Sequence, residues 1–144
     1  MSYELHKSPR RKLIPFENDD QRAVFEWAER QVEEKRYSEL CLMYLLPHAT
    51  RWSFLLMGYF ERATNIAAPD ICLPVPKGGF GALYIELRHA SAARRRPDEN
   101  DFVHGLRAFG NAALTVYGAD EAIAVIRSYL DELPLAGFDD PAQS

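Results

Sequence analysis

The sequence has few cysteines, no long apolar run and no large excess of charge of either sign. No apolar stretch approaches the roughly 20 residues that a membrane helix needs, and residues 1–12 are polar and basic, unlike a signal peptide. The two cysteines, Cys41 and Cys72, lie inside apolar runs typical of buried strands, which favours core residues over a disulfide or metal ligands. We therefore expect a soluble, cytoplasmic protein without a membrane segment.

Several familiar enzyme signatures are also missing. The sequence has no Walker loop, no Ser, His and Asp set and no Cys or His spacing typical of a metal site. The glycine-rich residues 78–81 do not lead from a strand into a helix, so they indicate a hairpin turn. The net charge of −4 argues against a dedicated nucleic-acid coat, although one basic face would be enough for local binding of a phosphate backbone. Arg94, Arg95 and Arg96 could form such a face or a solvated loop.

The chain has the size of one ordinary domain. Its 144 residues are 47% hydrophobic, which is enough to bury a core. Residues 1–16 contain prolines and no apolar periodicity, which predicts a flexible basic arm. We expect the folded domain over residues 17–132 and a loose tail over residues 133–144.

The apolar pattern predicts an α/β fold with a mixed sheet flanked by helices. Helices are predicted over residues 18–35, 51–62, 97–110 and 120–130. Strands are predicted over residues 40–46, 70–75, 81–88 and 112–117. Asn18 and Gln21 resemble a capping pair at the start of the first helix, and the continuous apolar run 40–46 is typical of a buried central strand. The strands 70–75 and 81–88 should pair as a hairpin across the intervening turn.

The second hairpin strand carries a carboxylate and a cation on one face. Because strand side chains alternate, Glu86 and Arg88 share the face opposite to that of Ile85. Asp70 begins the partner strand, and hairpin pairing could bring it near Glu86 to give two hard oxygen ligands for Mg²⁺. Judged on this strand alone, a solvent-facing pair of Glu86 and Arg88 is an equally good interpretation.

Two further carboxylates are candidates for the same site. Glu99 precedes the apolar residues Phe102, Val103 and Leu106 at helical spacing, so it should lie on the inward face of its helix. An inward carboxylate needs a partner, and a metal or Arg88 would serve. Glu17, at the start of the first helix, is the other candidate, although an acidic residue there often only complements the helix dipole.

The hairpin resembles the core of the VRR-NUC family of the PD-(D/E)xK nuclease superfamily. It has the sequence PDICLPVP over residues 69–76 and GGFGALYIELR over residues 78–88, where the family has a Pro-Asp hairpin leading to Ile-Glu-x-Lys. Residues 17–21 with Trp27 resemble the family's first helix, and residues 118–130 resemble its last helix. The resemblance is to the stand-alone type found in phages and bacteria.

This resemblance implies a metal-dependent DNA endonuclease that hydrolyses phosphodiester bonds, with branched or flapped DNA as an expected substrate and a homodimer as a possible assembly. It implies Mg²⁺ or Mn²⁺ as cofactor. The metal ligands would be Asp70, Glu86 and Glu17, the catalytic residues Asp70, Glu86, Arg88 and Glu99, and the DNA-binding residues Arg94, Arg95 and Arg96.

The chain departs from the family pattern at several positions. Arg88 stands where the family has lysine, Glu99 where it usually has glutamine, and Ala68 where it has glycine, while His48-Ala49-Thr50 replaces an Asn-Gly-Gly turn. An Arg88 to Glu99 ion pair could take the place of the metal. A second hypothesis is therefore a catalytically impaired nuclease fold that binds a protein or DNA, such as a phage-encoded inhibitor of a host system. The aromatic residues 51–60 would then be its contact surface.

Overall fold

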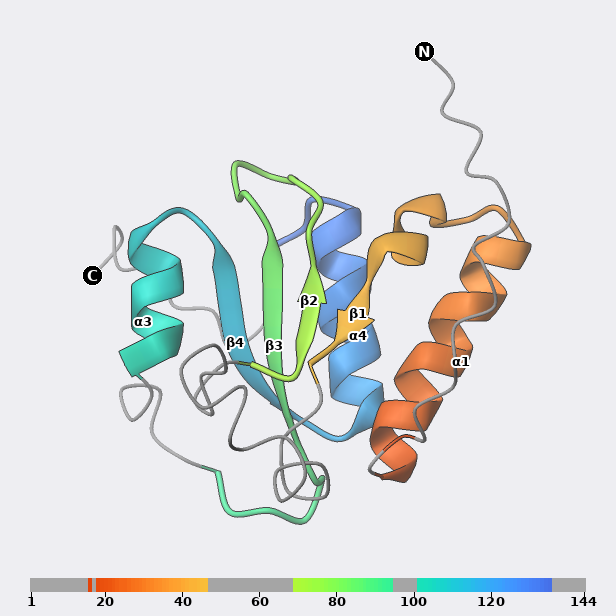
Figure 1. The fold of residues 1–144 in the computed structure, drawn as a ribbon, viewed down its shortest axis with the longest axis horizontal. Helices are drawn as coiled ribbons and strands as arrows, with labels where there is room; N and C mark the ends of the chain where they lie inside the picture. Colours follow the sequence, from red (N-terminus) through yellow and green to blue (C-terminus); the bar gives the residue numbers. More distant parts are fainter. Residues whose placement is uncertain (1–15, 17, 47–68, 95–100, 136–144) are drawn as a thin grey trace, which may run out of the picture.

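The computed structural model describes residues 16, 18–46, 69–94 and 101–135, which form a mixed four-stranded sheet flanked by helices (Figure 1). The strands are β1 (Tyr44–Leu45), β2 (Ile71–Leu73), β3 (Leu83–Arg88) and β4 (Ala112–Tyr117), in that spatial order. The helices are α1 (Asp19–Glu33), the 3-10 helix η1 (Ser38–Leu42), α3 (Asp101–Ala108) and α4 (Ala119–Leu130). The expected α/β fold is confirmed.

Helix α1 begins where the capping pattern predicts. The side chain of Asn18 accepts a hydrogen bond of 2.9 Å from the backbone N–H of Gln21, which satisfies a donor that has no partner inside the helix. Asp19 and Asp20 lie in the first turn, where their charges complement the helix dipole. The predicted range 18–35 agrees with the observed helix to within two residues.

The hairpin of β2 and β3 is also confirmed. The two strands are antiparallel, with Ile71 opposite Ile85 and Leu73 opposite Leu83. In the turn, Gly78 and Gly79 have φ values of 57° and 86°, left-handed conformations that glycine adopts without a side-chain clash. The turn glycines therefore close the hairpin.

The prediction of a buried central strand over residues 40–46 is wrong. Residues 38–42 form η1, the strand is limited to β1, and β1 lies at an edge of the described sheet. Leu40 and Met43 are buried, three residues apart as a 3-10 turn requires, whereas Tyr44 is 46% exposed. The unbroken apolar run thus contains the turn η1, whose Leu40 is buried, followed by the edge strand β1, whose Tyr44 is exposed. Of the two cysteines predicted in buried strands, Cys72 lies buried in β2, whereas Cys41 lies half-buried on η1.

Strand β4 runs parallel to β3 and leads directly into α4. Gly118, with a φ of 84°, makes the turn between them. Glu121 accepts a hydrogen bond of 2.6 Å from the backbone N–H of Tyr117, and Asp20 accepts one of 3.2 Å from that of Ala119. These contacts fasten the start of α4 to the end of the sheet and to α1. The predicted ranges 112–117 and 120–130 are confirmed.

Helix α3 connects the two parallel strands. The Nε of Arg107 donates a hydrogen bond of 2.8 Å to the backbone oxygen of Ala113 on β4. Helix α3 agrees with the helix predicted over 97–110 in the part that the structure describes. Residues 97–100 lie outside the described residues. The helix predicted over 51–62 also lies outside them, as do the predicted arm 1–16 except residue 16 and the predicted tail 133–144 except residues 133–135.

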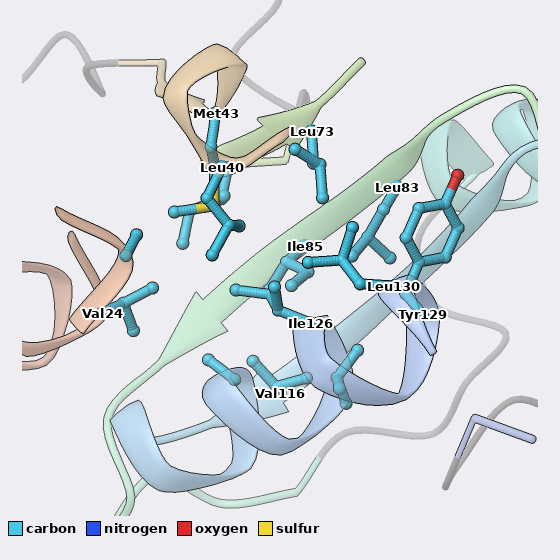
Figure 2. Close-up of a cluster of buried hydrophobic side chains, with 14 of the residues drawn as sticks. Val24, Leu40, Met43, Leu73, Leu83, Ile85, Val116, Ile126, Tyr129 and Leu130 are labelled. Carbon is cyan, nitrogen blue, oxygen red and sulfur yellow. The ribbon is translucent and has the colours of Figure 1, made fainter. Parts of the chain in front are cut away.

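The hydrophobic core lies between the sheet and helices α1 and α4 (Figure 2). Val24 of α1, Ile85 of β3 and Ile126 of α4 are each 0% exposed and all belong to this core. Burial of such side chains contributes roughly 1.5–3 kcal/mol each relative to exposure. In the described part of the chain, no helix has the length and apolar character that would let it cross a bilayer.

Replacing Ile85 by alanine should lower the free energy of unfolding by about 2–5 kcal/mol, because the truncation leaves a cavity where the fully buried side chain was. Urea denaturation followed by circular dichroism measures this change. Phe109→Ala is the control, since Phe109 is 90% exposed and its loss should change stability by no more than about 0.5 kcal/mol. Equal effects of the two substitutions would contradict this description of the core.

Candidate active site

The outer face, defined as the face of the sheet opposite the core, carries the polar side chains of β3. Leu83 and Ile85 are buried at 1% and 0% exposure, and Leu87 packs against the core from a half-buried position. Tyr84, Glu86 and Arg88 alternate with them and are half-buried. A carboxylate and a cation therefore share one face, as predicted.

The strand pairing aligns the outer face in rows across the sheet. The first row contains Tyr44, Cys72, Tyr84 and Ala113, the second Glu86 and Thr115, and the third Arg88 and Tyr117. Asp70 lies in a bend directly before β2, one residue beyond the pair of Ile71 and Ile85, and therefore adjoins the end of the second row. Of the two carboxylates predicted on the hairpin, Glu86 lies in the second row and Asp70 lies beside it.

Asp70 is a buried carboxylate held by the backbone of the next strand. It is 4% exposed, and its Oδ2 accepts a hydrogen bond of 2.8 Å from the N–H of Leu87. A buried carboxylate needs such a donor, because transfer from water without one is costly. This contact connects the end of β2 to β3 and fixes one oxygen of Asp70 beside the second row.

Glu86 is paired with the cation two residues further along its own strand. The Nη2 of Arg88 donates to Oε1 of Glu86 at 2.6 Å, and the Thr115 hydroxyl donates to Oε2 at a longer 3.4 Å. The side chains of Glu86 and Arg88 are 19% and 27% exposed. The Nε of Arg88 is buried and has no hydrogen-bond acceptor among the described residues. Among the described residues, the Arg88 guanidinium thus donates to Glu86 through Nη2 and has no acceptor for Nε.

A row of two tyrosines and a thiol borders the carboxylates. A hydrogen bond to Cys72, together with burial, raises the pKa of Tyr44 to about 12. Burial, followed by the charge and hydrogen bond of Cys72, also raises the pKa of Tyr84. Sequence reasoning missed this row, because only the strand register brings residues 44, 72 and 84 together.

Arg94 lies at the same end of β4 as the third row. Its guanidinium carbon is 4.8 Å from the centre of the Tyr117 ring, and its Nη1 is 3.4 Å from Oε1 of Glu121. Because Tyr117 is the register partner of Arg88, Arg94 adds a second cation near this end of the outer face. Of the predicted site residues, the structure describes Asp70, Glu86, Arg88 and Arg94.

The other predicted site residues lie outside the described residues. They are Glu17, Glu99, Arg95 and Arg96. Among the residues that are described, no group of three or more His, Cys, Asp or Glu side chains could hold a metal ion. A metal bound here would take two protein carboxylates, those of Asp70 and Glu86, from the described part of the site. That number suits Mg²⁺, which keeps several waters and commonly binds one or two carboxylates plus substrate phosphates.

Comparison with known proteins identifies the fold. No family model matches the sequence, and no curated protein matches it. A solved structure described as a VRR_NUC domain protein is similar, with a TM-score of 0.62 and 20% identity. The similarity covers 89% of this chain and 99% of the other. The chain therefore has the fold of a VRR-NUC domain, as its hairpin sequence predicts.

Asp70→Ala should lower the free energy of unfolding in metal-free buffer by about 1–3 kcal/mol, because it leaves the half-buried N–H of Leu87 without the side-chain acceptor that it has in the wild type. Asp70→Asn keeps an oxygen at that place and should cost clearly less. Urea denaturation in the presence of a chelator compares the two variants. If both were as stable as the wild type, the hydrogen bond to Leu87 would not support the fold.

Cys72→Ala should move the pKa of Tyr44 from about 12 back toward its ordinary value of 10.0, since the hydrogen bond to Cys72 is the largest cause of the shift. A raised pKa means that the neutral hydroxyl stabilises the fold below about pH 10 and that this stability is lost as the pH approaches 12. Titration of ring-labelled tyrosine by NMR measures the shift. Tyr37 is the internal control, because burial and Asp131 raise its pKa without Cys72.

Proposed function

We propose that this chain, which has the VRR-NUC fold, is a metal-dependent DNA endonuclease with Asp70 and Glu86 as metal ligands. The observation that carries the proposal is the second row of the outer face. Glu86 lies in β3, and the buried carboxylate of Asp70 lies beside it, directly before β2. A buried carboxylate beside another acidic residue is costly for a purely structural role and is typical of a metal-binding site.

The donor chemistry of the pair fits Mg²⁺ or Mn²⁺. Both side chains offer hard oxygen atoms, and the waters and phosphate oxygens that complete such a site need not come from the protein. When bound, the ion would activate a water and polarise the scissile phosphate. The hydrogen bond from Leu87 orients Asp70, while Glu86 faces it from the adjacent strand.

The cations at this end of the sheet support a phosphate-containing substrate. Arg88 adjoins Glu86 at 2.6 Å, and Arg94 lies against Tyr117 at the end of β4. A guanidinium can donate two hydrogen bonds to one phosphate, and Arg95 and Arg96 would extend the contact along the DNA backbone. With a net charge of −4 the attraction to DNA is local, so binding should weaken steeply with salt. The resemblance of the hairpin favours branched or flapped DNA.

The test is cleavage of linear, flapped and junction DNA with Mg²⁺ or Mn²⁺. Asp70→Asn and Glu86→Gln should lower the rate by at least the roughly 10- to 100-fold that loss of an outer partner of a metal ligand costs. These variants remove charge and keep hydrogen-bond acceptors, so the fold is preserved. Glu34→Gln, on an exposed residue, is the matched control and should cut like the wild type. Cleavage that is insensitive to both site substitutions would refute the assignment.

A second candidate is a nuclease fold that has lost cleavage and acts by binding DNA or a protein. The observation that favours it is the short ion pair of Arg88 and Glu86, which already offsets the charge of one proposed ligand. The same assay separates the candidates. DNA binding without cleavage by the wild type, together with cleavage by Arg88→Lys, would favour this second function. The aromatic residues 51–60 proposed as its contact surface lie outside the described residues.

A further inference from the structure

Arg88 forms an ion pair with the carboxylate of Glu86, which the proposed metal would need as a ligand. Its Nη2 lies 2.6 Å from Oε1 of Glu86, while Oε2 has a distant contact with the Thr115 hydroxyl at 3.4 Å. Since the two side chains are 27% and 19% exposed, solvent screens this pair less than a surface pair. A divalent cation coordinated by Glu86 would stand directly beside a permanently charged guanidinium. Repulsion between the two should weaken metal binding to the protein alone.

The guanidinium also has unused capacity to bind an anion. Arg88 uses Nη2 for Glu86, but its buried Nε has no hydrogen-bond acceptor among the residues that the structure describes. Adjacent N–H groups of one guanidinium can bind two oxygens of a phosphate together. Phosphate binding would therefore satisfy Nε and draw Arg88 away from Glu86.

We propose that Arg88 is a latch that makes metal binding depend on a DNA phosphate. Without DNA it neutralises Glu86, and with DNA it binds the phosphate and leaves Glu86 to the metal. The inference rests on the proposed function, because it takes Asp70 and Glu86 as the ligands. Arg88 thereby acts as a positioning residue, and by thermodynamic linkage metal and DNA each raise the affinity for the other by the same factor.

The test is the affinity for Mn²⁺, measured by electron paramagnetic resonance of the free ion with and without a saturating short DNA duplex. Wild-type protein should bind Mn²⁺ weakly alone and at least roughly tenfold more tightly with the duplex. Arg88→Gln should bind Mn²⁺ more tightly without DNA. The duplex should raise its affinity by a clearly smaller factor than in the wild type, because only the phosphate oxygens that join the site remain to couple the two ligands. Arg88→Lys keeps the charge but loses the fork, so its coupling should be smaller than that of the wild type.

Arg36→Gln is the matched control. Arg36 also pairs with a glutamate two residues away, at 3.3 Å from Glu34, but on an exposed surface. It should retain the full coupling. Titration of Asp70→Asn with the same duplex gives the Mn²⁺ bound by DNA itself, and fluorescence anisotropy verifies that each variant is saturated.

Equal Mn²⁺ affinity of the wild type with and without the duplex would overturn the latch. So would an undiminished increase in Arg88→Gln. In either case, Mn²⁺ binding that disappears in Asp70→Asn would leave the proposed metal site standing. Absence of Mn²⁺ binding by the wild type in both states would overturn the site and the latch together.

Discussion

The register of β3 is the constraint on which both the core and the candidate site depend. Ile85 is fully buried on one face of this strand, and Glu86 points from the next position to the other face. A slip of one residue against β2 or β4 would move a charged side chain into the core and expose an apolar one. The burial of Ile85 therefore also fixes where Glu86 and Arg88 lie. The hydrophobic effect supplies the precision that a metal site needs.

The ion pair of Glu86 and Arg88 on the outer face contributes little to holding the fold together. A half-buried ion pair such as that of Glu86 and Arg88 is offset by the loss of hydration, so it is weak evidence for stability. The core on the opposite face supplies most of the folding free energy. Partners on the outer face can therefore change without unfolding the domain. The proposed exchange requires this freedom, since Arg88 leaves Glu86 for a DNA phosphate before Glu86 binds the metal.

The sequence predicted the elements whose signals are local. Helix α1 has its capping pair, the hairpin has its turn glycines, and β4 and α4 have clear apolar periods. The run 40–46 was mispredicted, because an unbroken apolar stretch does not reveal whether it forms a strand or a turn followed by an exposed edge. Asp70 and Glu86 lie on the predicted hairpin, Asp70 directly before β2 and Glu86 in β3, while their role as metal ligands stays a prediction. The sequence predicted that Glu86 and Arg88 share one face of the strand. It did not decide between Glu86 and Glu99 as the partner of Arg88, since rotamers determine which partner a long side chain takes.

Long-range register was beyond sequence reasoning. The row of Tyr44, Cys72 and Tyr84 requires the pairing of three strands that are separated along the chain, and nothing local in the sequence encodes it. The predicted contributions of Glu17, Glu99, Arg95 and Arg96 stay predictions, because they lie outside the described residues.

The mixed topology of the sheet also bears on how the site is assembled in time. The contact between Asp70 and Leu87 spans 17 positions of one hairpin, an element that can form within microseconds. The contact between Glu86 and Thr115 spans 29 positions and forms only after the chain has crossed over through α3 to a parallel strand. Parallel pairing of this kind is slow, because loop closure must precede its contacts. The carboxylates would thus face one another early in folding, before their surroundings on β4 arrive.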